Sequence, residues 1–451
     1  MIYLSPRFIK KVRHKIPWIS HIINEDNAGE FNPYMGKISG AYRTNICVIC
    51  RGSKNLCRKK VCPVLEKQYV IYRVKKKLDR KIEGSSPPEI FVGRIGYPNV
   101  YVGPLFYSER KDITHFSIAE YWDFATISEF LNMRLSLIRG MSKINIKRPN
   151  QNKKLHQRLI DTVLSKRALD SEAEFRKLID KPTIGAYIQP IGIRGIIGDF
   201  EVYPKGSLRE LEKVYYDEDL KANEAIIELY RNNVYVSRII QGLSAGMYGL
   251  ENQRKLVPTR WSITAIDCII SKWLRDEIIK YKPTINNNLV FEYNGMGDKF
   301  IVILFPGSWK YEFIEIWWPG SSWNYFGNYI AICGDYELHW GRTTYASIGG
   351  CYYATRLAVS EYLSKIGIKA GVIVIREAYP EHYMPVGVWY VRESVRRALL
   401  GKPYEFADFD GAIKFALSRL KVRSIEVLKV MRLIKDVKQQ KSILEYINKN
   451  G

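Results

Sequence analysis

Long hydrophobic runs are missing from this chain of 451 residues. No segment reaches the roughly 18 uninterrupted apolar residues that a membrane-spanning helix needs, and runs such as 301–305 have the length of a buried strand. The first residues are basic, but no apolar stretch or small-residue cleavage site follows them, so a secretory signal is also missing. We therefore expect a protein that has no membrane partner and stays in the cytoplasm.

Histidine is scarce, and so are complete nucleotide-binding motifs. The six histidines are scattered at positions 14, 21, 115, 156, 339 and 382, and no Ser–His–Asp or Cys–His group stands out. The segment 294–298 has two spaced glycines but lacks the Lys-Ser/Thr of a phosphate-binding loop, and Gly93-x-x-Gly96 is incomplete as a dinucleotide fingerprint. We interpret 294–298 as a hairpin turn and 90–104 as two strands joined by a tight turn.

Acidic residues are too few to balance the basic ones. The sequence has 70 Lys+Arg against 46 Asp+Glu, a formal net charge of +24. A surface of that charge attracts polyanions through the release of counterions, which makes nucleic acid the leading class of partner. The alternative is that the charge serves solubility alone. The many aromatic residues (31 Tyr, 17 Phe and 10 Trp) leave RNA as well as DNA open, because aromatic rings stack on bases of either kind.

The hydrophobic content of 46% and the chain length predict a folded protein of more than one domain. Helices and strands are interspersed without a βαβ rhythm or an internal repeat, so we expect an α+β protein with mixed helices and antiparallel strands. The expected helical segments are 66–81, 118–182, 208–279 and 351–366, followed by two helices at the C-terminus. The expected strands lie within 90–104, 289–348 and 371–376.

Four of the seven cysteines are grouped with the spacing Cys47-x2-Cys50-x6-Cys57-x4-Cys62. A CxxC pair followed by two more thiolates in one short loop suits tetrahedral coordination, and predicts a small N-terminal module with structural zinc. Basic neighbours offset the thiolate charge: Arg51, Lys54, Arg58, Lys59 and Lys60. An iron–sulfur cluster is the main alternative, because Cys62-Pro63 resembles the end of cluster-binding runs. Disulfides are less compatible with a cytoplasmic protein. The other cysteines, at 268, 333 and 351, are isolated in apolar contexts.

The C-terminal segment has the pattern Gln-x-x-aliphatic-x-x-aromatic-apolar, carried by Gln440, Ile443, Tyr446 and Ile447. It resembles the peptide with which replication and repair proteins dock onto the DNA sliding clamp (PCNA). One turn of 3₁₀ helix would bring the three apolar side chains to one side, while the glutamine binds a small polar pocket. Ile447 departs from the pattern, which usually has a second aromatic residue there. A terminal amphipathic helix would produce a similar sequence.

A catalytic metal site is the sharpest enzymatic hypothesis. Asp335, Glu337 and His339 alternate with apolar residues, so on a strand they would share one face. Two carboxylates and a histidine can hold a divalent metal ion, which a nuclease would need. The alternative is a half-buried strand with one face in water.

Two further segments carry a family resemblance: Leu256-Val257-Pro258-Thr259-Arg260-Trp261-Ser262-Ile263-Thr264-Ala265-Ile266-Asp267 and Met384-Pro385-Val386-Gly387-Val388-Trp389-Tyr390-Val391-Arg392-Glu393. Together with the cysteine group and the terminal pattern, they make the chain resemble the archaeal Nre family of DNA-repair proteins. The resemblance implies participation in the repair of DNA damage, with the sliding clamp as partner. It also implies four segments: a basic arm with the zinc module (1–85), an Nre N-terminal-like core (86–340), an Nre C-terminal-like domain (341–438) and a clamp-binding tail (439–451).

Four arginines of these segments are candidates for DNA contact: Arg260, Arg392, Arg396 and Arg397. Arg260 lies near a helix start, where backbone amides and a guanidinium together can hold a phosphate. Each of them could instead form a salt bridge or belong to a solvated basic face. Two hypotheses remain open: a DNA-binding repair factor recruited to the clamp, or a metal-dependent DNA-processing enzyme.

Replacing Cys47 by serine tests the metal site, because it removes one of the four thiolates. We expect the Cys47→Ser variant to lose the stoichiometric zinc of the native protein, measured by elemental analysis of the purified chain. The isolated Cys268 supplies the matched control, and Cys268→Ser should keep the metal. Full zinc content in Cys47→Ser would show the assignment to be wrong, and iron with labile sulfide in the native protein would favour the cluster.

Overall fold

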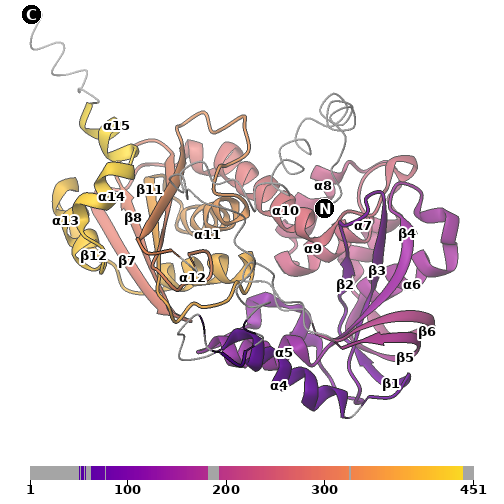
Figure 1. Ribbon diagram of the computed structural model, residues 1–451. Helices are drawn as coiled ribbons and strands as arrows, with labels where there is room; N and C mark the ends of the chain where they lie inside the picture. Colours follow the sequence, from indigo (N-terminus) through magenta and orange to yellow (C-terminus); the bar gives the residue numbers. More distant parts are fainter. Residues whose placement is uncertain are drawn as a thin grey trace, which may run out of the picture. The chain divides into compact units, whose positions relative to one another are not determined.

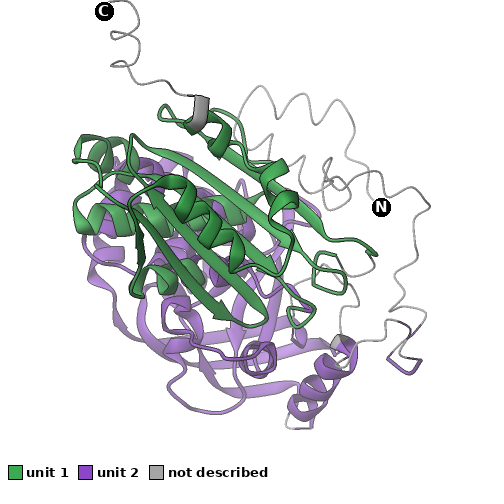
Figure 2. Ribbon diagram, turned by 90° about the vertical axis from the view of Figure 1, so that its left-hand side faces the viewer, with its two compact units in different colours: residues 1–41, 274–382, 394–451 green, residues 42–273, 383–393 purple. Residues whose placement is uncertain are grey.

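The computed structural model describes residues 52–54, 56, 62–76, 78–180, 192–324 and 327–439, together with Cys50. The chain divides into two compact units that each take more than one segment of the sequence (Figure 2). Unit 2 consists of residues 42–273 and 383–393, and unit 1 of residues 1–41, 274–382 and 394–451. Among the described residues, no helix is both long enough and apolar enough to cross a membrane.

Unit 2 contains a sheet of six strands in the order β1-β5-β6-β4-β3-β2. The strands are β1 (Lys81–Ser86), β2 (Ile90–Val92), β3 (Asn99–Phe106), β4 (Ile138–Asn145), β5 (Ser165–Ile179) and β6 (Arg194–Ser207). All neighbours pair antiparallel except β4 and β6, which are parallel. The predicted pair of strands within 90–104 is confirmed as β2 and β3.

In sequence, the helices of unit 2 precede, separate or follow the strands of the sheet (Figure 1). They are α4 (Pro63–Lys75), α5 (Ile127–Leu135), α6 (Lys153–Leu164), α7 (Arg209–Tyr216), α8 (Ala222–Arg231), α9 (Val236–Ser244) and α10 (Thr259–Trp273). Short 3₁₀ turns occur at Thr114–Ser117, Ala119–Tyr121, Pro149–Asn152 and Glu251–Gln253. The helical character predicted for 208–279 is confirmed, and the apolar stripe of α10 lies in the core through Trp261, Ile266 and Ile270.

Two of the predicted helices are partly wrong. The helix expected over 66–81 ends at Lys75, and Lys81 instead begins β1. Within 118–182, α5 and α6 are present but β4 and β5 are strands. β5 is paired on both sides, by β1 and by β6, so partners distant in sequence fix its conformation. Long-range pairing of this kind overrides local helix propensity.

Unit 1 contains a second sheet of six strands, in the order β10-β9-β11-β8-β7-β12. The strands are β7 (Asn288–Gly295), β8 (Asp298–Phe305), β9 (Lys310–Trp317), β10 (Ala331–Glu337), β11 (Gly371–Ala378) and β12 (Tyr404–Phe406). Only β9 and β11 pair in parallel among these described neighbours. The hairpin predicted at 294–298 is confirmed: Met296 and Gly297, with φ of 45° and 81°, connect β7 to β8.

Helices cover both faces of this sheet. They are α11 (Gly350–Ile366), the end of α12 (Val388–Leu400), α13 (Phe409–Ser418), α14 (Ser424–Val430) and α15 (Leu433–Gln439), with a π-turn at Leu274–Ile278 and a 3₁₀ turn at Ile279–Tyr281. Ile303, Ile314 and Ile375 form one core with Ile413 of α13 and Met431 after α14. On the opposite face, the ring of Tyr352 in α11 packs on Tyr311 of β9. The sheet is therefore buried on both sides, which explains its continuous apolar strands.

The class expectation is confirmed at the level of a mixed α+β protein with two mostly antiparallel sheets. The expected boundary at residue 340 does not coincide with the division into units, because the sheet of unit 1 combines β7–β10 with β11 and β12. The zinc module and the tail of 440–451 lie largely outside the described residues.

The two segments that carry the family resemblance meet in the interior of unit 2. Nη1 of Arg392 lies 2.8 Å from Oδ1 of Asp267, and both side chains are buried, Arg392 being 1% exposed. Trp389, on the same helix as Arg392, packs edge-on against Trp122, with ring centroids 4.7 Å apart. The distinctive residues of these segments thus connect elements more than a hundred positions apart.

Breaking the Asp267–Arg392 pair should destabilise unit 2 strongly. An Arg392→Met variant leaves the Asp267 carboxylate buried without its cation, which typically costs about 3–5 kcal/mol. We expect a loss of that size in urea unfolding followed by tryptophan fluorescence. The double variant Asp267→Leu/Arg392→Met should recover part of it, because the buried charge of Asp267 is removed, while the buried Glu393 still loses its ion pair with Arg392. A single-variant loss below about 1 kcal/mol, typical of exposed pairs, would contradict this account.

Candidate nucleic-acid interface

The turn between β2 and β3 presents a cation and an aromatic ring. Gly96 takes the left-handed conformation, with φ of 85°, and Asn99 N–H donates to its carbonyl over 2.9 Å. Tyr97 N–H donates to the carbonyl of Arg94 over 3.3 Å, which closes the turn. Ile95 at the tip is 84% exposed, so the turn projects from the sheet.

The start of α10 is held beside this turn. Val92 N–H, at the end of β2, donates to Oγ1 of Thr259 over 2.9 Å. The ring of Trp261, in the first turn of the helix, lies 5.7 Å from the ring of Tyr97 between centroids. Arg260, which lies between Thr259 and Trp261 in the sequence, is exposed. The N-terminal amides of a helix and an adjacent guanidinium together favour a bound anion.

A third segment, around Ile146 and Lys147, contacts the turn between β2 and β3. Ile146 N–H donates to the carbonyl of Pro98 over 3.0 Å, and the carbonyl of Ile146 accepts from Leu256 N–H over 3.2 Å. Lys147 follows directly, and its Nζ lies 5.6 Å from the centre of the Tyr97 ring. The basic segment 147–154 forms a 3₁₀ turn and the capped start of α6, and most of its residues are exposed.

We name the surface formed by Arg94, Tyr97, Lys147 and Arg260 the turn surface. Burial, and then repulsion from Arg260, lower the pKa of Arg94 to about 10. Neither Lys147 nor Arg260 forms an ion pair with any carboxylate in the part of the chain that the structure describes. Exposed cations such as Lys147 and Arg260, next to aromatic rings, are the combination that binds phosphates and bases of a nucleic-acid strand.

The other three candidate arginines are engaged within the protein. Arg392 is buried against Asp267, so it is not presented to a DNA backbone. Arg396 forms an ion pair with Glu361 at 2.8 Å, and Arg397 donates to the Tyr293 hydroxyl over 3.2 Å. Of the four arginines selected from the sequence, Arg260 is therefore the one that the structure leaves exposed to a ligand.

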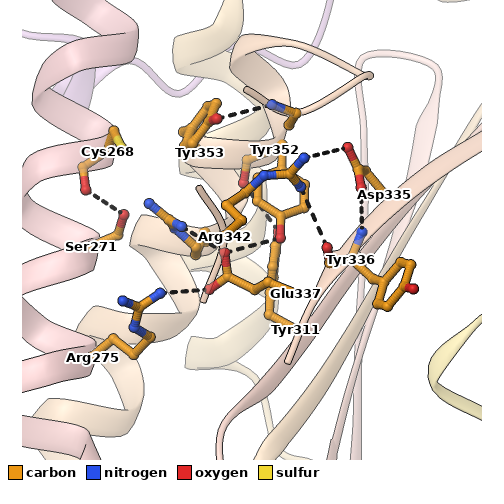
Figure 3. A network of polar contacts seen from close by, with 12 residues as sticks. Cys268, Ser271, Arg275, Tyr311, Asp335, Tyr336, Glu337, Arg342, Tyr352 and Tyr353 are labelled. Atoms are coloured by element: carbon orange, nitrogen blue, oxygen red, sulfur yellow. Dashed lines mark hydrogen bonds and ion pairs between the residues drawn. The ribbon is translucent and has the colours of Figure 1, made fainter. Parts of the chain in front are cut away.

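The structure places Asp335 and Glu337 on the same face of β10, as the sequence predicts, but each carboxylate already has cationic partners. Figure 3 shows Arg342 directed toward Asp335, and Arg275 and the Tyr352 hydroxyl directed toward Glu337. The Glu337 carboxylate accepts from Arg275 over 3.2 Å and from Tyr352 over 3.2 Å. It also accepts from Arg356 over 2.8 Å and from Trp309 Nε1 over 2.9 Å. His339 lies beyond the end of the strand, with its ring beside Trp340.

The electrostatics of this cluster fit a structural role. Burial alone would raise the pKa of Glu337, but Arg356, Trp309 and Arg275 outweigh it and lower the pKa below its ordinary value. Glu337 therefore stays ionised, and its charge is balanced by two guanidinium groups that are themselves buried. No group of three His, Cys, Asp or Glu side chains is placed to hold a metal ion among the residues described. The interpretation of Asp335, Glu337 and His339 as metal ligands stays a prediction, and these contacts favour the structural alternative.

The cysteine cluster is described only in part. Cys50 is buried, and its carbonyl accepts from Ser53 N–H and from Ser53 Oγ, each over 2.9 Å. Gly52 between them has a φ of 82°, the left-handed conformation that this turn requires. Cys62 precedes the first residue of α4. Cys47 and Cys57 lie outside the described residues, as do Gln440, Ile443, Tyr446 and Ile447 of the terminal pattern.

Comparison with known proteins adds the family. The model described as "Archaeal Nre, N-terminal" matches residues 56–324, and "Archaeal Nre, C-terminal" matches residues 337–446. The chain belongs to the archaeal Nre family. Two Nre relatives from Archaeoglobus fulgidus are each 38% identical over 375 residues: "DNA repair protein NreB", with 82% of this chain and 92% of the relative covered, and "DNA repair protein NreA", with 83% and 93%.

A third relative, "DNA repair protein NreA" of Haloferax volcanii, is 34% identical over 348 residues, which cover 73% of this chain and 81% of the relative. No solved structure matches the chain. The turn surface lies entirely inside the residues matched by the Nre N-terminal model.

The Nre N-terminal region carries a second cationic and aromatic surface that the sequence analysis did not single out. On α4, Tyr69 and Tyr72 are 64% and 56% exposed. Arg73 lies 4.9 Å from the centre of the Tyr69 ring, and Lys76 lies 4.8 Å from that of Tyr72. We name this the α4 surface. The signal was present in the sequence, because residues three and four apart share one side of a helix, here Leu65, Tyr69 and Tyr72.

The turn surface can be tested by removing its exposed cations. We expect the double variant Lys147→Gln/Arg260→Gln to bind a short DNA duplex or single strand more weakly at every sequence tried, measured by fluorescence anisotropy. The slope of log affinity against log salt should fall by about 1–2, because about two phosphate contacts are lost.

The matched control is Lys166→Gln/Lys272→Gln, which removes the same charge from exposed positions of the same unit. This control should leave the slope within error of the native value. Equal losses in both double variants would mean that bulk charge, and not the turn surface, binds the nucleic acid.

Proposed function

We propose that this Nre protein acts in DNA repair as a DNA-binding factor that is recruited to the DNA sliding clamp. The match to relatives named DNA repair proteins, over nearly three quarters or more of each chain, supports the repair role. The observation that carries DNA binding is the turn surface, where Lys147 and Arg260 are exposed without carboxylate partners in the described part of the chain.

The physical basis of binding is the release of counterions from the nucleic acid. Lys147 and Arg260 would each neutralise a phosphate, and the amides at the start of α10 would add partial positive charge. On the α4 surface, Tyr69 and Tyr72 offer exposed ring faces on which unpaired bases can stack. Both surfaces belong to unit 2. Cations bind any sequence, so the proposed contact is to the backbone and to unstacked bases, and it carries no sequence code.

The zinc module supports the same unit in this proposal. Four thiolates at Cys47, Cys50, Cys57 and Cys62 would hold the short loop that leads into α4, because a structural zinc ion supplies folding free energy to segments with little core of their own. An iron–sulfur cluster remains the alternative for these four ligands. In either case the metal centre would fix the position of the start of α4, and thereby the positions of the exposed tyrosines Tyr69 and Tyr72.

Recruitment to the clamp would concentrate the protein where DNA is being processed. Gln440, Ile443, Tyr446 and Ile447 supply the docking pattern. A tether of this kind turns the DNA contact into an intramolecular event, and overall avidity rises without any new contact. Weak, sequence-independent DNA binding is then sufficient for a role at repair sites.

Deleting residues 440–451 tests recruitment. We expect the truncated chain to lose binding to the purified clamp, measured by surface plasmon resonance, while its thermal unfolding stays unchanged. Within the pattern, Tyr446→Ala should weaken clamp binding at least tenfold, because it removes an aromatic anchor. Lys449→Ala lies just outside the pattern and should have little effect. Unchanged clamp affinity of the truncated chain would remove the tail from the proposal.

A further inference from the structure

Arg139, in β4, has a guanidinium that forms no ion pair with any carboxylate among the described residues. Its Nε atom is buried and has no hydrogen-bond partner among the described residues. Its nearest counterpart across the sheet is another arginine, because Arg139 and Arg194 face each other on the parallel strands β4 and β6. Residues that face each other in this way point to the same side of a sheet, so the two positive charges lie side by side.

The surroundings of Arg139 hold the guanidinium in place without satisfying it. Its Cζ lies 3.7 Å from the centre of the Phe91 ring, on β2. A Cβ atom at Gly93 would lie 3.3 Å from Nη2 of Arg139, so the absence of a side chain at Gly93 makes room for the group. The guanidinium is therefore fixed between an aromatic ring and the backbone at the end of a strand. A cation held in this way is preorganised to bind a ligand, unlike a flexible charge on the surface.

Other buried arginines of this protein show what compensation looks like. Arg238 donates to three backbone carbonyls, those of Pro88, Val163 and Ser165. Arg376 forms ion pairs with Asp298 and Glu315, and Arg392 with Asp267. Removing a cation from water without such partners lowers the stability of the fold. A protein that keeps such a cation therefore uses it for a purpose other than stability.

The segment 181–191, which runs into β6 just before Arg194, contains no Asp or Glu. Burial, and then repulsion from Arg194, lower the pKa of Arg139 to about 10, in keeping with a cation that lacks a counter-ion. The site thus combines two guanidinium groups with room left by a glycine, and no described carboxylate forms an ion pair with either arginine.

We propose that Arg139 and Arg194 form a phosphate-binding site. Guanidinium groups match the oxygens of a phosphate in pairs, and a doubly charged anion would neutralise both arginines at once. The site adjoins the turn surface through consecutive residues, since Arg94 follows Gly93. It rests on the proposed function only for the source of the phosphate, which is either a nucleic-acid strand on the turn surface or a free phosphate compound.

Thermal unfolding of the full chain with inorganic phosphate tests the site itself. At constant ionic strength, with chloride as the balancing anion, phosphate should raise the unfolding temperature of the native protein by roughly 2–4 °C. The Arg139→Gln variant should lose this rise. Without phosphate it should unfold at the native temperature or above it, because it no longer buries an uncompensated cation. Arg194→Gln should lose most of the rise as well.

Arg134 provides the matched control, because it is a compensated arginine of the same unit with both terminal nitrogens 2.9 Å from the Glu89 carboxylate. Arg134→Gln should unfold at a lower temperature and still respond fully to phosphate. An undiminished phosphate response in both Arg139→Gln and Arg194→Gln would overturn the proposal. So would a native protein that responds to phosphate no more than to chloride.

DNA affinity of the same variants identifies the source of the phosphate. If Arg139→Gln loses both the phosphate response and about tenfold in DNA affinity, a strand supplies the phosphate. If it loses the phosphate response while DNA affinity is unchanged, the site binds a free phosphate compound. A native protein that does not bind DNA at all would refute the proposed function, and the phosphate response would still decide the site.

Discussion

The neutralisation of buried charge is the constraint on which the organisation of this protein depends. In unit 1, the carboxylate of Glu337 lies between Arg275 and Arg356, and Arg376 lies between Asp298 and Glu315. Unpaired, each of these charges would cost several kcal/mol in the interior. These buried carboxylates are therefore paired with arginines of the same unit. With 46 acids against 70 bases, cations are in excess, and Lys147 and Arg260, which form no ion pair among the described residues, lie at the turn surface of unit 2.

The same constraint separates the structural from the functional part of the family segments. Arg392 and Asp267 meet in the interior, and Trp389 packs among the aromatic rings of unit 2. These residues are explained by folding. Arg260 belongs to the same segment as Asp267, but its side chain is exposed beside Arg94 and Tyr97. In this segment, one face of the helix stabilises unit 2, and the start of the helix presents a cation to a ligand.

Helices, strands and turns that are determined by their local sequence pattern can be predicted from the sequence. Helix α11 and the apolar strand β11 were predicted nearly to the residue, and so was the hairpin at Gly297. β4 and β5 were missed because their partners lie far away in sequence. The charge of the chain predicts a polyanionic partner, and Arg260 was identified as a candidate. The sequence does not show that Arg392 is buried, because its carboxylate partner lies 125 positions away. For the same reason it does not show that Glu337 is already neutralised, or that Arg139 forms no ion pair among the described residues.

The central claim is that the cations of the turn surface in unit 2 contact nucleic acid. Hydrogen–deuterium exchange of the full chain, with and without a short DNA single strand, tests it most directly. The account predicts slower exchange on DNA binding in the turn of residues 94–99, in residues 145–152 and at the start of α10, with little change in β8, β9 and β11 of unit 1. Protection confined to unit 1, around β10 and α11, would contradict the account.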